Sequence, residues 1–235
     1  MLTAVLVTAA VLVLLALGVA LADRVLAALA ERKASEYLSQ PFGHPATVRV
    51  HGVPFLTQAL RGRYRDVEVS GGGLQVGEMA GATLEAHLHN VYLPARELLG
   101  GRTTELPCEH VEGRLVLPYG ELARVSRIPG LALAFVDERL LASAALPVPG
   151  ISQLARVSGQ ARLGLVDGTV RLRVSGLSVA GIGLTRLIIR QLLPRLDVPI
   201  PLPVLPYGLR LDELRPAPAG LVVDGSAAAV VFRRP

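Results

Sequence analysis

The most strongly patterned part of the chain is its first 22 residues. From Met1 to Ala22 no side chain is charged, and only two threonines and one glycine interrupt the run of Ala, Val and Leu. At 1.5 Å per residue, a helix of this length spans a bilayer core of about 30 Å. The pattern predicts a signal peptide or a signal-anchor transmembrane helix over residues 1–22, followed by a single exported domain over residues 23–235.

Two observations bear on whether this segment is cleaved. Ala20-Leu21-Ala22 has the small-residue spacing of a cleavage site, directly before Asp23. The apolar run is longer than an ordinary signal-peptide core and lacks a basic start, which favours an uncleaved anchor or a start codon upstream of Met1. The cations that follow the run, taken alone, favour a cytoplasmic flank. We expect export, and both cleavage and anchoring stay open.

Residues 23–39 predict a second helical stretch. Its larger side chains recur at three- and four-residue steps, at Val25, Leu26, Leu29, Lys33 and Tyr37. Pro41 and Gly43 are expected to end the helix.

After residue 44 the hydrophobic period changes from helical to two. Aliphatic residues alternate with charged or polar ones at Val48 and Val50, Val67 and Val69, Leu84, Ala86 and Leu88, and Val170, Leu172 and Val174. This alternation predicts half-buried antiparallel strands. Turns are expected at Gly71-Gly72-Gly73, Gly100-Gly101, Asp167-Gly168 and Asp224-Gly225, with the third of these giving the clearest hairpin signal.

Two short helices and one proline-rich segment complete the predicted architecture. The helices are expected over Tyr119–Ser126 and Leu184–Leu193, both amphipathic. Residues 197–206 alternate proline with aliphatic residues, which predicts an extended edge or a polyproline-like crossing rather than a central strand. No polar linker divides the chain, so the sequence predicts one α+β domain behind a membrane segment.

Composition and charge narrow the class of partner. The chain has 235 residues, 51% of them hydrophobic, but aromatic residues make up only 4% and tryptophan is absent. The net charge of +5 comes almost entirely from arginine, since Lys33 is the only lysine. Proteins that stack on bases need aromatic platforms, so we expect an anionic membrane surface rather than nucleic acid as the partner. A single cysteine, Cys108, excludes an intramolecular disulfide.

One group of residues has the composition of a metal site. His87 and His89 lie two apart on a predicted strand, and Cys108 and His110 could lie on a strand paired with it. The alternative is that the two histidines occupy the solvent side of a strand whose other side is apolar, with Cys108 as a small buried hydrophobe. The second interpretation is favoured, and no metal or other cofactor is predicted.

No complete catalytic motif is present. Gly176-Leu177-Ser178-Val179-Ala180 begins like a nucleophile elbow but ends in alanine, and the glycine-rich segment from Gly181 ends in arginine at the position where a dinucleotide-binding motif needs glycine. The carboxylates mostly neighbour arginines, as surface charges do. We therefore predict no catalytic residue.

The remaining unusual feature is the combination of apolar runs with arginines, in segments that carry no reactive group. Ligand sites are mostly apolar with a few polar groups, and arginine binds phosphate through two parallel hydrogen bonds. The predicted apolar lining of a lipid site comprises Val53, Leu131, Leu133, Phe135, Leu187, Ile188 and Leu192. Arg186 and Arg190, one turn apart, are the predicted contacts to a headgroup or a membrane. Each apolar run could instead belong to the core.

Two segments carry a family resemblance. They are Val50-His51-Gly52-Val53-Pro54-Phe55-Leu56-Thr57-Gln58, behind the membrane segment, and Pro203-Val204-Leu205-Pro206-Tyr207-Gly208-Leu209-Arg210-Leu211, followed by Ala219-Gly220-Leu221-Val222-Val223. In this order, from about Ala22 to Phe232, the chain resembles the LmeA-like family of actinobacterial phospholipid-binding envelope proteins. The family pattern often has phenylalanine where Val53 and Tyr207 stand. Phe55 and Leu56 are carried over as further residues of the apolar site.

The resemblance implies a fold and a function. The expected fold is a curved antiparallel sheet wrapped around one or more helices, as in tubular lipid-binding proteins. The expected function is non-enzymatic binding or transfer of anionic phospholipid at the outer face of the plasma membrane, in the cell envelope. It also implies a link to lipoglycan elongation, with an envelope glycosyltransferase as a partner. The alternatives are an envelope hydrolase or metal-dependent lipid-modifying enzyme, and a ligand-free protein that stabilises an envelope synthase.

Overall fold

The structure of the chain is a computed structural model. It describes residues 2–42, 44–94, 105–126, 128–147, 154–166, 169–179, 182–183, 198–200 and 209–233.

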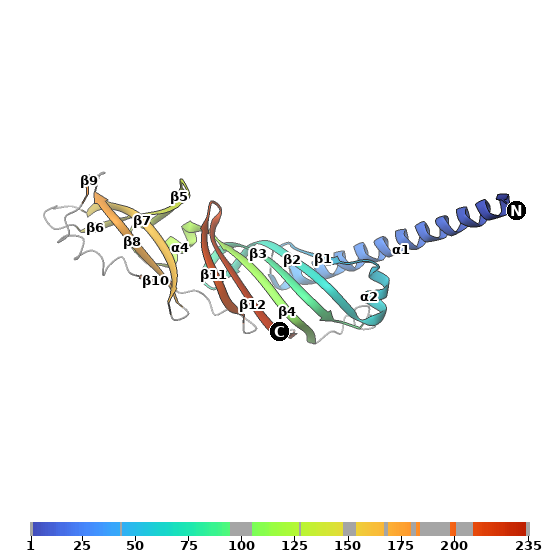
Figure 1. Ribbon diagram of the computed structural model, residues 1–235. Coiled ribbons are helices and arrows are strands. Elements are labelled where there is room, and N and C mark those ends of the chain that lie inside the picture. The colour runs from blue at the N-terminus through green and yellow to red at the C-terminus, as the bar shows by residue number, and fades with distance from the viewer. Residues whose placement is uncertain are drawn as a thin grey trace. The chain divides into compact units, whose positions relative to one another are not determined.

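Most of the described chain is β-strand, and the labelled strands and helices can be followed in Figure 1. The helices are α1 (Leu2–Phe42), α2 (Phe55–Arg61) and α4 (Tyr119–Val125). The first six strands are β1 (Ala46–His51), β2 (Arg63–Val76), β3 (Met79–Tyr92), β4 (Glu105–Leu117), β5 (Ala132–Val136) and β6 (Arg139–Pro147). The other six are β7 (Leu154–Val166), β8 (Thr169–Val179), β9 (Ile182–Gly183), β10 (Val198–Ile200), β11 (Arg210–Ala217) and β12 (Gly220–Arg233).

The strands form two open sheets. One has the order β1-β2-β3-β4-β12-β11, and the other has the order β10-β8-β7-β6-β5, with β9 also paired to β8. The strand pairs whose registers are described are all antiparallel. The predicted α+β class, with antiparallel sheet and an N-terminal apolar helix, is confirmed.

The chain divides into two compact units. Unit 1 comprises residues 1–71, 85–112 and 227–235, and unit 2 comprises residues 72–84 and 113–226. Strands β2, β3, β4 and β12 each contribute residues to both. The prediction of one exported domain over residues 23–235 stays a prediction.

In unit 1, the second half of α1 covers the open edge of β1. Glu31, Ser35 and Ser39 accept hydrogen bonds from the backbone N–H groups of Val50, Val48 and Ala46, at 2.8, 2.9 and 2.9 Å. Four helical residues advance about 6 Å, and two strand residues advance nearly the same distance. Polar side chains four residues apart on α1 therefore lie opposite alternate N–H groups of β1. This contact protects an edge that would otherwise pair with another chain.

The packed side of α1 differs from the side that the sequence pattern suggests. Val25, Leu26 and Leu29, the large apolar residues of the pattern, are all exposed, whereas Asp23 and Ala27 are buried. The helix itself is confirmed, and it runs without interruption from the apolar segment to Phe42, next to the predicted stop at Pro41.

Unit 2 has an aliphatic core around α4. Leu122 of α4 is fully buried, together with Leu117 of β4, Leu172 of β8 and Leu221 of β12. The predicted helix over 119–126 is confirmed by α4, whose first turn follows Pro118. Both sheets contribute side chains to this core, which holds α4 in place.

A buried tyrosine ties α4 to the turn between β11 and β12. The Tyr119 hydroxyl donates a hydrogen bond to the Ala217 carbonyl at 2.8 Å and accepts one from the Ala217 N–H at 3.1 Å. In unit 1, the buried Tyr64 hydroxyl has no hydrogen-bond partner among the described residues. The two tyrosines therefore allow a comparison between a buried hydroxyl that is hydrogen-bonded and a buried hydroxyl that is not.

Tyr119→Phe is expected to lower the free energy of unfolding by about 1 kcal/mol, because it removes two hydrogen bonds from Ala217. Tyr64→Phe is expected to leave it unchanged or slightly higher, because a buried hydroxyl without a partner stabilises nothing. Urea denaturation of both variants, followed by circular dichroism, tests the pair. Equal effects would contradict the described bonding.

Two predicted turns lie within strands instead. Gly71-Gly72-Gly73 belongs to β2, and the chain reverses at Gly77 and Glu78 before β3 begins. Asp224-Gly225 lies inside β12. The β11–β12 register shifts between Leu211 and Glu213, and a Cβ on Gly225 would stand 2.7 Å from the Arg210 carbonyl oxygen. Glycine at position 225 lets β12 approach β11 closely where their register shifts. In the sequence, a glycine that serves this purpose looks the same as a glycine in a turn.

Asp224 links three neighbouring strands of unit 2. Its carboxylate accepts hydrogen bonds from Arg114 Nε of β4 and from Arg215 Nη2 of β11, each at 2.8 Å. Burial by itself raises the pKa of Asp224, but the two guanidinium groups outweigh it and hold the pKa below its ordinary value.

Asp224→Asn is expected to destabilise unit 2 at neutral pH and to have little effect in acid. A carboxyl whose pKa is lowered by folding contributes stability above its unfolded pKa of about 3.9 and loses that contribution as the pH falls through the folded value. The gap in denaturation midpoint between wild type and variant is therefore expected to be constant from pH 7 to about pH 5 and to close below about pH 4. A gap that persists unchanged in acid would contradict the ion-pair account.

The other predicted features fall partly within the described residues. Val166 and Thr169 are paired across β7 and β8, which confirms the predicted hairpin, although Asp167 and Gly168 themselves lie outside the described residues. β10 lies at the edge of its sheet and carries Pro199, as predicted for the proline-rich segment. The predicted turn at Gly100-Gly101 and the predicted helix Leu184–Leu193 lie outside the described residues.

Candidate functional site

An open pocket lies in unit 2 between α4 and the beginning of β5. Its volume is about 440 Å³, and its lining is mostly apolar or glycine: Gly120, Ala123, Arg124, Ile128, Gly130, Leu131, Ala132 and Leu133. Pockets that bind small ligands have volumes of about 300–1,000 Å³ and mostly apolar walls. The pocket therefore has the size of a site for part of a small ligand, and its open walls expose both apolar and polar atoms.

Two residues of the predicted lipid site, Leu131 and Leu133, line this pocket. Together with Phe135, which is not part of the lining, they pack against the core of unit 2. Leu133 is paired with Ala142 and Phe135 with Leu140 across β5 and β6. Because paired residues share a face of a sheet, this alternation directs the large side chains of β5 inward.

Arg124 supplies the charge of the pocket. Its Nη2 and Nε donate hydrogen bonds to Glu121 Oε2 at 2.7 and 3.2 Å, and Nη2 also donates to the Glu78 carbonyl. These bonds, with one from the Ala80 N–H, hold the pKa of Glu121 below its ordinary value. The described contacts of Arg124 do not use Nη1. About half of the side chain is exposed, so an anion can reach it from solvent.

The residues carried over from the family resemblance lie in unit 1, outside this pocket. Phe55, in the first turn of α2, is buried and its ring lies 6.0 Å from that of Tyr64. Val53 and Leu56 are exposed. Their assignment to a lipid site stays a prediction. The predicted residues Leu187, Ile188, Leu192, Arg186 and Arg190 lie outside the described residues.

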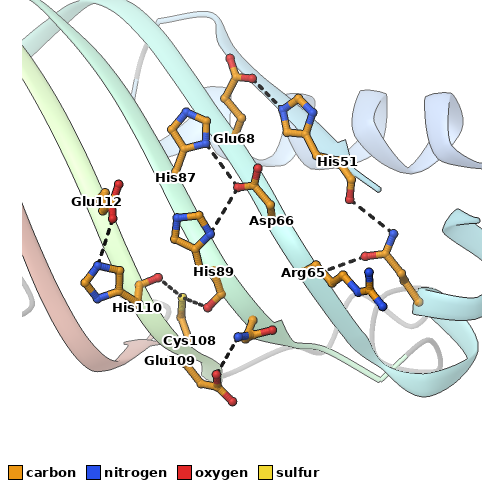
Figure 2. A network of polar contacts seen from close by, with 12 residues as sticks. His51, Arg65, Asp66, Glu68, His87, His89, Cys108, Glu109, His110 and Glu112 are labelled. Atoms are coloured by element: carbon orange, nitrogen blue, oxygen red, sulfur yellow. Dashed lines mark hydrogen bonds and ion pairs between the residues drawn. The ribbon is translucent and has the colours of Figure 1, made fainter. Parts of the chain in front are cut away.

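Four of the five histidines form a row on the sheet strands of unit 1, as Figure 2 shows. The rings of His51 and His87, of His87 and His89, and of His89 and His110 are stacked with centroids 6.1–6.4 Å apart. A carboxylate stands beside each ring. Glu68 pairs with His51 at 2.8 Å, Asp66 with His87 and His89 at 3.3 and 3.9 Å, and Glu112 with His110 at 3.3 Å.

This arrangement confirms that His87 and His89 occupy the solvent side of β3, since both are partly exposed while Leu88 between them is buried. Cys108 is buried, and its thiol donates to the carbonyls of His89 and His110 at 3.2 and 3.0 Å. Burial raises the pKa of the Cys108 thiol, which disfavours the thiolate that metals bind. In the described part of the chain, no three His, Cys, Asp or Glu residues are arranged to hold a metal ion.

Three of the pocket residues, Gly120, Ala123 and Arg124, carry no sequence signal for a site. Ile128, Gly130 and Ala132 belong to the uncharged stretch that contains the predicted Leu131, Leu133 and Phe135. Arg124 follows Glu121 at the i, i+3 spacing of an ordinary surface ion pair, so only the approach of β5 to α4 distinguishes it.

Comparison with known protein families places most of the chain in one of them. Residues 21–226 match the family described as LmeA-like phospholipid-binding. Comparisons with curated proteins and with solved structures give no significant match.

Proposed function

This chain belongs to the LmeA-like phospholipid-binding family, and we propose that the pocket of unit 2 holds an acyl chain of the bound phospholipid while Arg124 contacts its phosphate. The observation that carries the proposal is the pocket itself, which combines aliphatic side chains with the partly exposed guanidinium of Arg124. Leu131 and Leu133 would contact the chain.

The two parts of the pocket suit the two parts of a phospholipid. Each methylene buried against the apolar walls contributes about 0.8 kcal/mol. A guanidinium binds a phosphate oxygen through short, charge-assisted hydrogen bonds, and Arg124 retains Nη1 for this purpose. Glu121 partly neutralises Arg124 by pairing with Nε and Nη2, so the phosphate contact proposed here is a hydrogen bond from Nη1. Arg186 and Arg190 stay proposed as additional headgroup or membrane contacts.

We further propose that the protein acts without catalysis at the outer face of the plasma membrane, in the cell envelope. One observation supports this placement: α1 contains an apolar segment near the N-terminus that is long enough to cross a membrane. Binding or transfer of anionic phospholipid there would serve lipoglycan elongation, in contact with an envelope glycosyltransferase.

Native mass spectrometry of the full chain, purified in mild detergent with its cellular lipid, tests the proposal. We expect a mass increment that matches a phospholipid and that persists after detergent exchange. A lipid-free chain that also fails to take up phosphatidylglycerol from vesicles would overturn the proposal. Hydrolysed lipid in the same preparation would indicate catalysis instead.

A further inference from the structure

Helix α2 presents an apolar side that no described residue covers. Leu56 and Leu60, one turn apart, are 42% and 76% exposed, and Val53 in the loop before the helix is 67% exposed. We call these three residues the apolar foot. On the other side of α2, Phe55 and Gln58 are buried, and Gln58 bonds to the backbone of Gly52 and Arg65. The foot is therefore a fixed surface on a well-anchored helix.

The position of the foot is set by the first charged residue of α1. Asp23 Oδ2 and Oδ1 accept hydrogen bonds from the N–H groups of Phe55 and Leu56, at 2.9 and 2.7 Å. The first turn of α2 therefore lies at the level of Asp23 along α1. In the sequence, Asp23 directly follows the 22 uncharged residues.

The contacts of α1 show which part of it is available to a bilayer. Glu31, Ser35 and Ser39 are bonded to the edge of β1, as described above. Charged side chains are costly in the hydrocarbon region of a membrane, and this half of α1 carries Glu31, Arg32, Lys33 and Glu36, so it stays outside with the sheet. The uncharged run from Met1 to Ala22 remains, and its length matches a bilayer core of about 30 Å. Asp23 then lies at the bilayer surface.

We propose that the apolar foot rests in the interfacial layer of the same bilayer that α1 crosses, as a second membrane contact beside the transmembrane segment. Amphipathic helices at an interface bury their apolar side about 5–10 Å into the boundary between headgroups and acyl chains. This burial is possible for the apolar foot, because the hydrogen bonds to Asp23 hold the first turn of α2 at the bilayer surface.

The charges near the foot favour a lipid surface over a protein as its partner. Arg24 follows Asp23, and Arg61 is in the last turn of α2. Arginines at this level attract anionic headgroups while apolar neighbours enter the boundary. The inference rests on the anchored placement proposed above but not on the pocket of unit 2. Functionally, it holds unit 1 against the membrane from which a lipid would be taken.

The test uses the full chain in vesicles of phosphatidylcholine and phosphatidylglycerol. A single cysteine is introduced as Leu60→Cys on a Cys108→Ala background and labelled with an environment-sensitive fluorophore. We expect blue-shifted emission and strong quenching by lipids with a nitroxide near the glycerol, with weaker quenching by a nitroxide at the chain end. Glu112→Cys, at a side chain 63% exposed on β4, is the matched control and is expected to stay unquenched.

Equal quenching at the two sites, or a chain that washes off the vesicles, overturns the inference. Leu60→Asp provides a second measurement, because Leu60 is exposed and its replacement does not disturb the core. We expect Leu60→Asp to retain lipid in the pocket as wild type does. If the Leu60 label is quenched but no lipid is retained, the pocket proposal fails alone. If lipid is retained without quenching, the foot fails alone.

Discussion

Gly120→Leu is expected to weaken phospholipid binding on the order of 50-fold. Gly120 lines the pocket, and a Cβ built there meets no heavy atom within 4 Å. The leucine side chain would therefore enter open space and displace about three methylenes of the ligand, at about 0.8 kcal/mol each. Leucine also favours the helical conformation over glycine by nearly 1 kcal/mol, so α4 is expected to persist. Lipid retained by the full chain, measured by native mass spectrometry, reports the loss.

The matched control is Gly164→Leu. Gly164 is exposed on β7, is not part of the pocket lining, and also has no heavy atom within 4 Å of its Cβ position. The same side chain is thus added to the same unit in a different place. If Gly120→Leu loses lipid while Gly164→Leu retains as much lipid as wild type, the acyl chain lies against α4. Wild-type retention by both variants would show that the lipid binds elsewhere.

Local patterns predicted the strands and the short helix well, because each of these elements buries one side. The alternation of Leu172 and Val174 with arginines describes a half-buried strand, and both aliphatic residues are buried in β8. Tyr119–Ser126 was recognisable for a similar reason, since Tyr119, Leu122 and Val125 recur at helical spacing and are all buried. In such elements the residue pattern and the burial have the same period.

The hydrophobic and turn patterns gave wrong predictions where contacts between residues distant in the sequence determine the structure. In α1 the exposed side carries Val25, Leu26 and Leu29, and the packed side carries serine and glutamate because it must supply acceptors to a strand edge. The glycines at 71–73 and 225 serve strand irregularities that only the neighbouring strand requires.

The candidate site was predictable only in part, for the same reason. Leu131 and Leu133 belong to an apolar stretch that stands out in the sequence, whereas Arg124 belongs to an ordinary helical ion pair. The pocket exists because α4 and β5, joined by a short connection, leave space between small residues at 120, 123 and 130. These small residues create the pocket by leaving space, and they carry no large apolar or charged side chain that the sequence pattern could reveal.

The position of α4 depends on a close backbone approach at Gly220, and Gly220→Ala is expected to be the most damaging single change in unit 2. Gly220 has φ of +152°, and a Cβ there would stand 2.2 Å from the Leu117 carbonyl oxygen and 3.3 Å from Pro118 Cα, directly before α4. Both neighbours are backbone atoms, so neither can rotate away. The backbone conformation alone costs a non-glycine residue about 1–3 kcal/mol.

Relief of the overlap requires the turn between β11 and β12 to move away from α4, and that movement would also break the bonds between Tyr119 and Ala217. We therefore expect Gly220→Ala to lower the free energy of unfolding by about 3 kcal/mol or more and to reduce lipid retention together with stability. Gly72→Ala is the control, because its Cβ meets only Thr83 Oγ1 at 4.0 Å. Removing a flexible glycine from a strand there is expected to be neutral or slightly stabilising. Urea denaturation of both variants compares them, and similar midpoints would show that the β11–β12 turn does not hold α4, leaving the pocket to depend on the core around Leu122 alone.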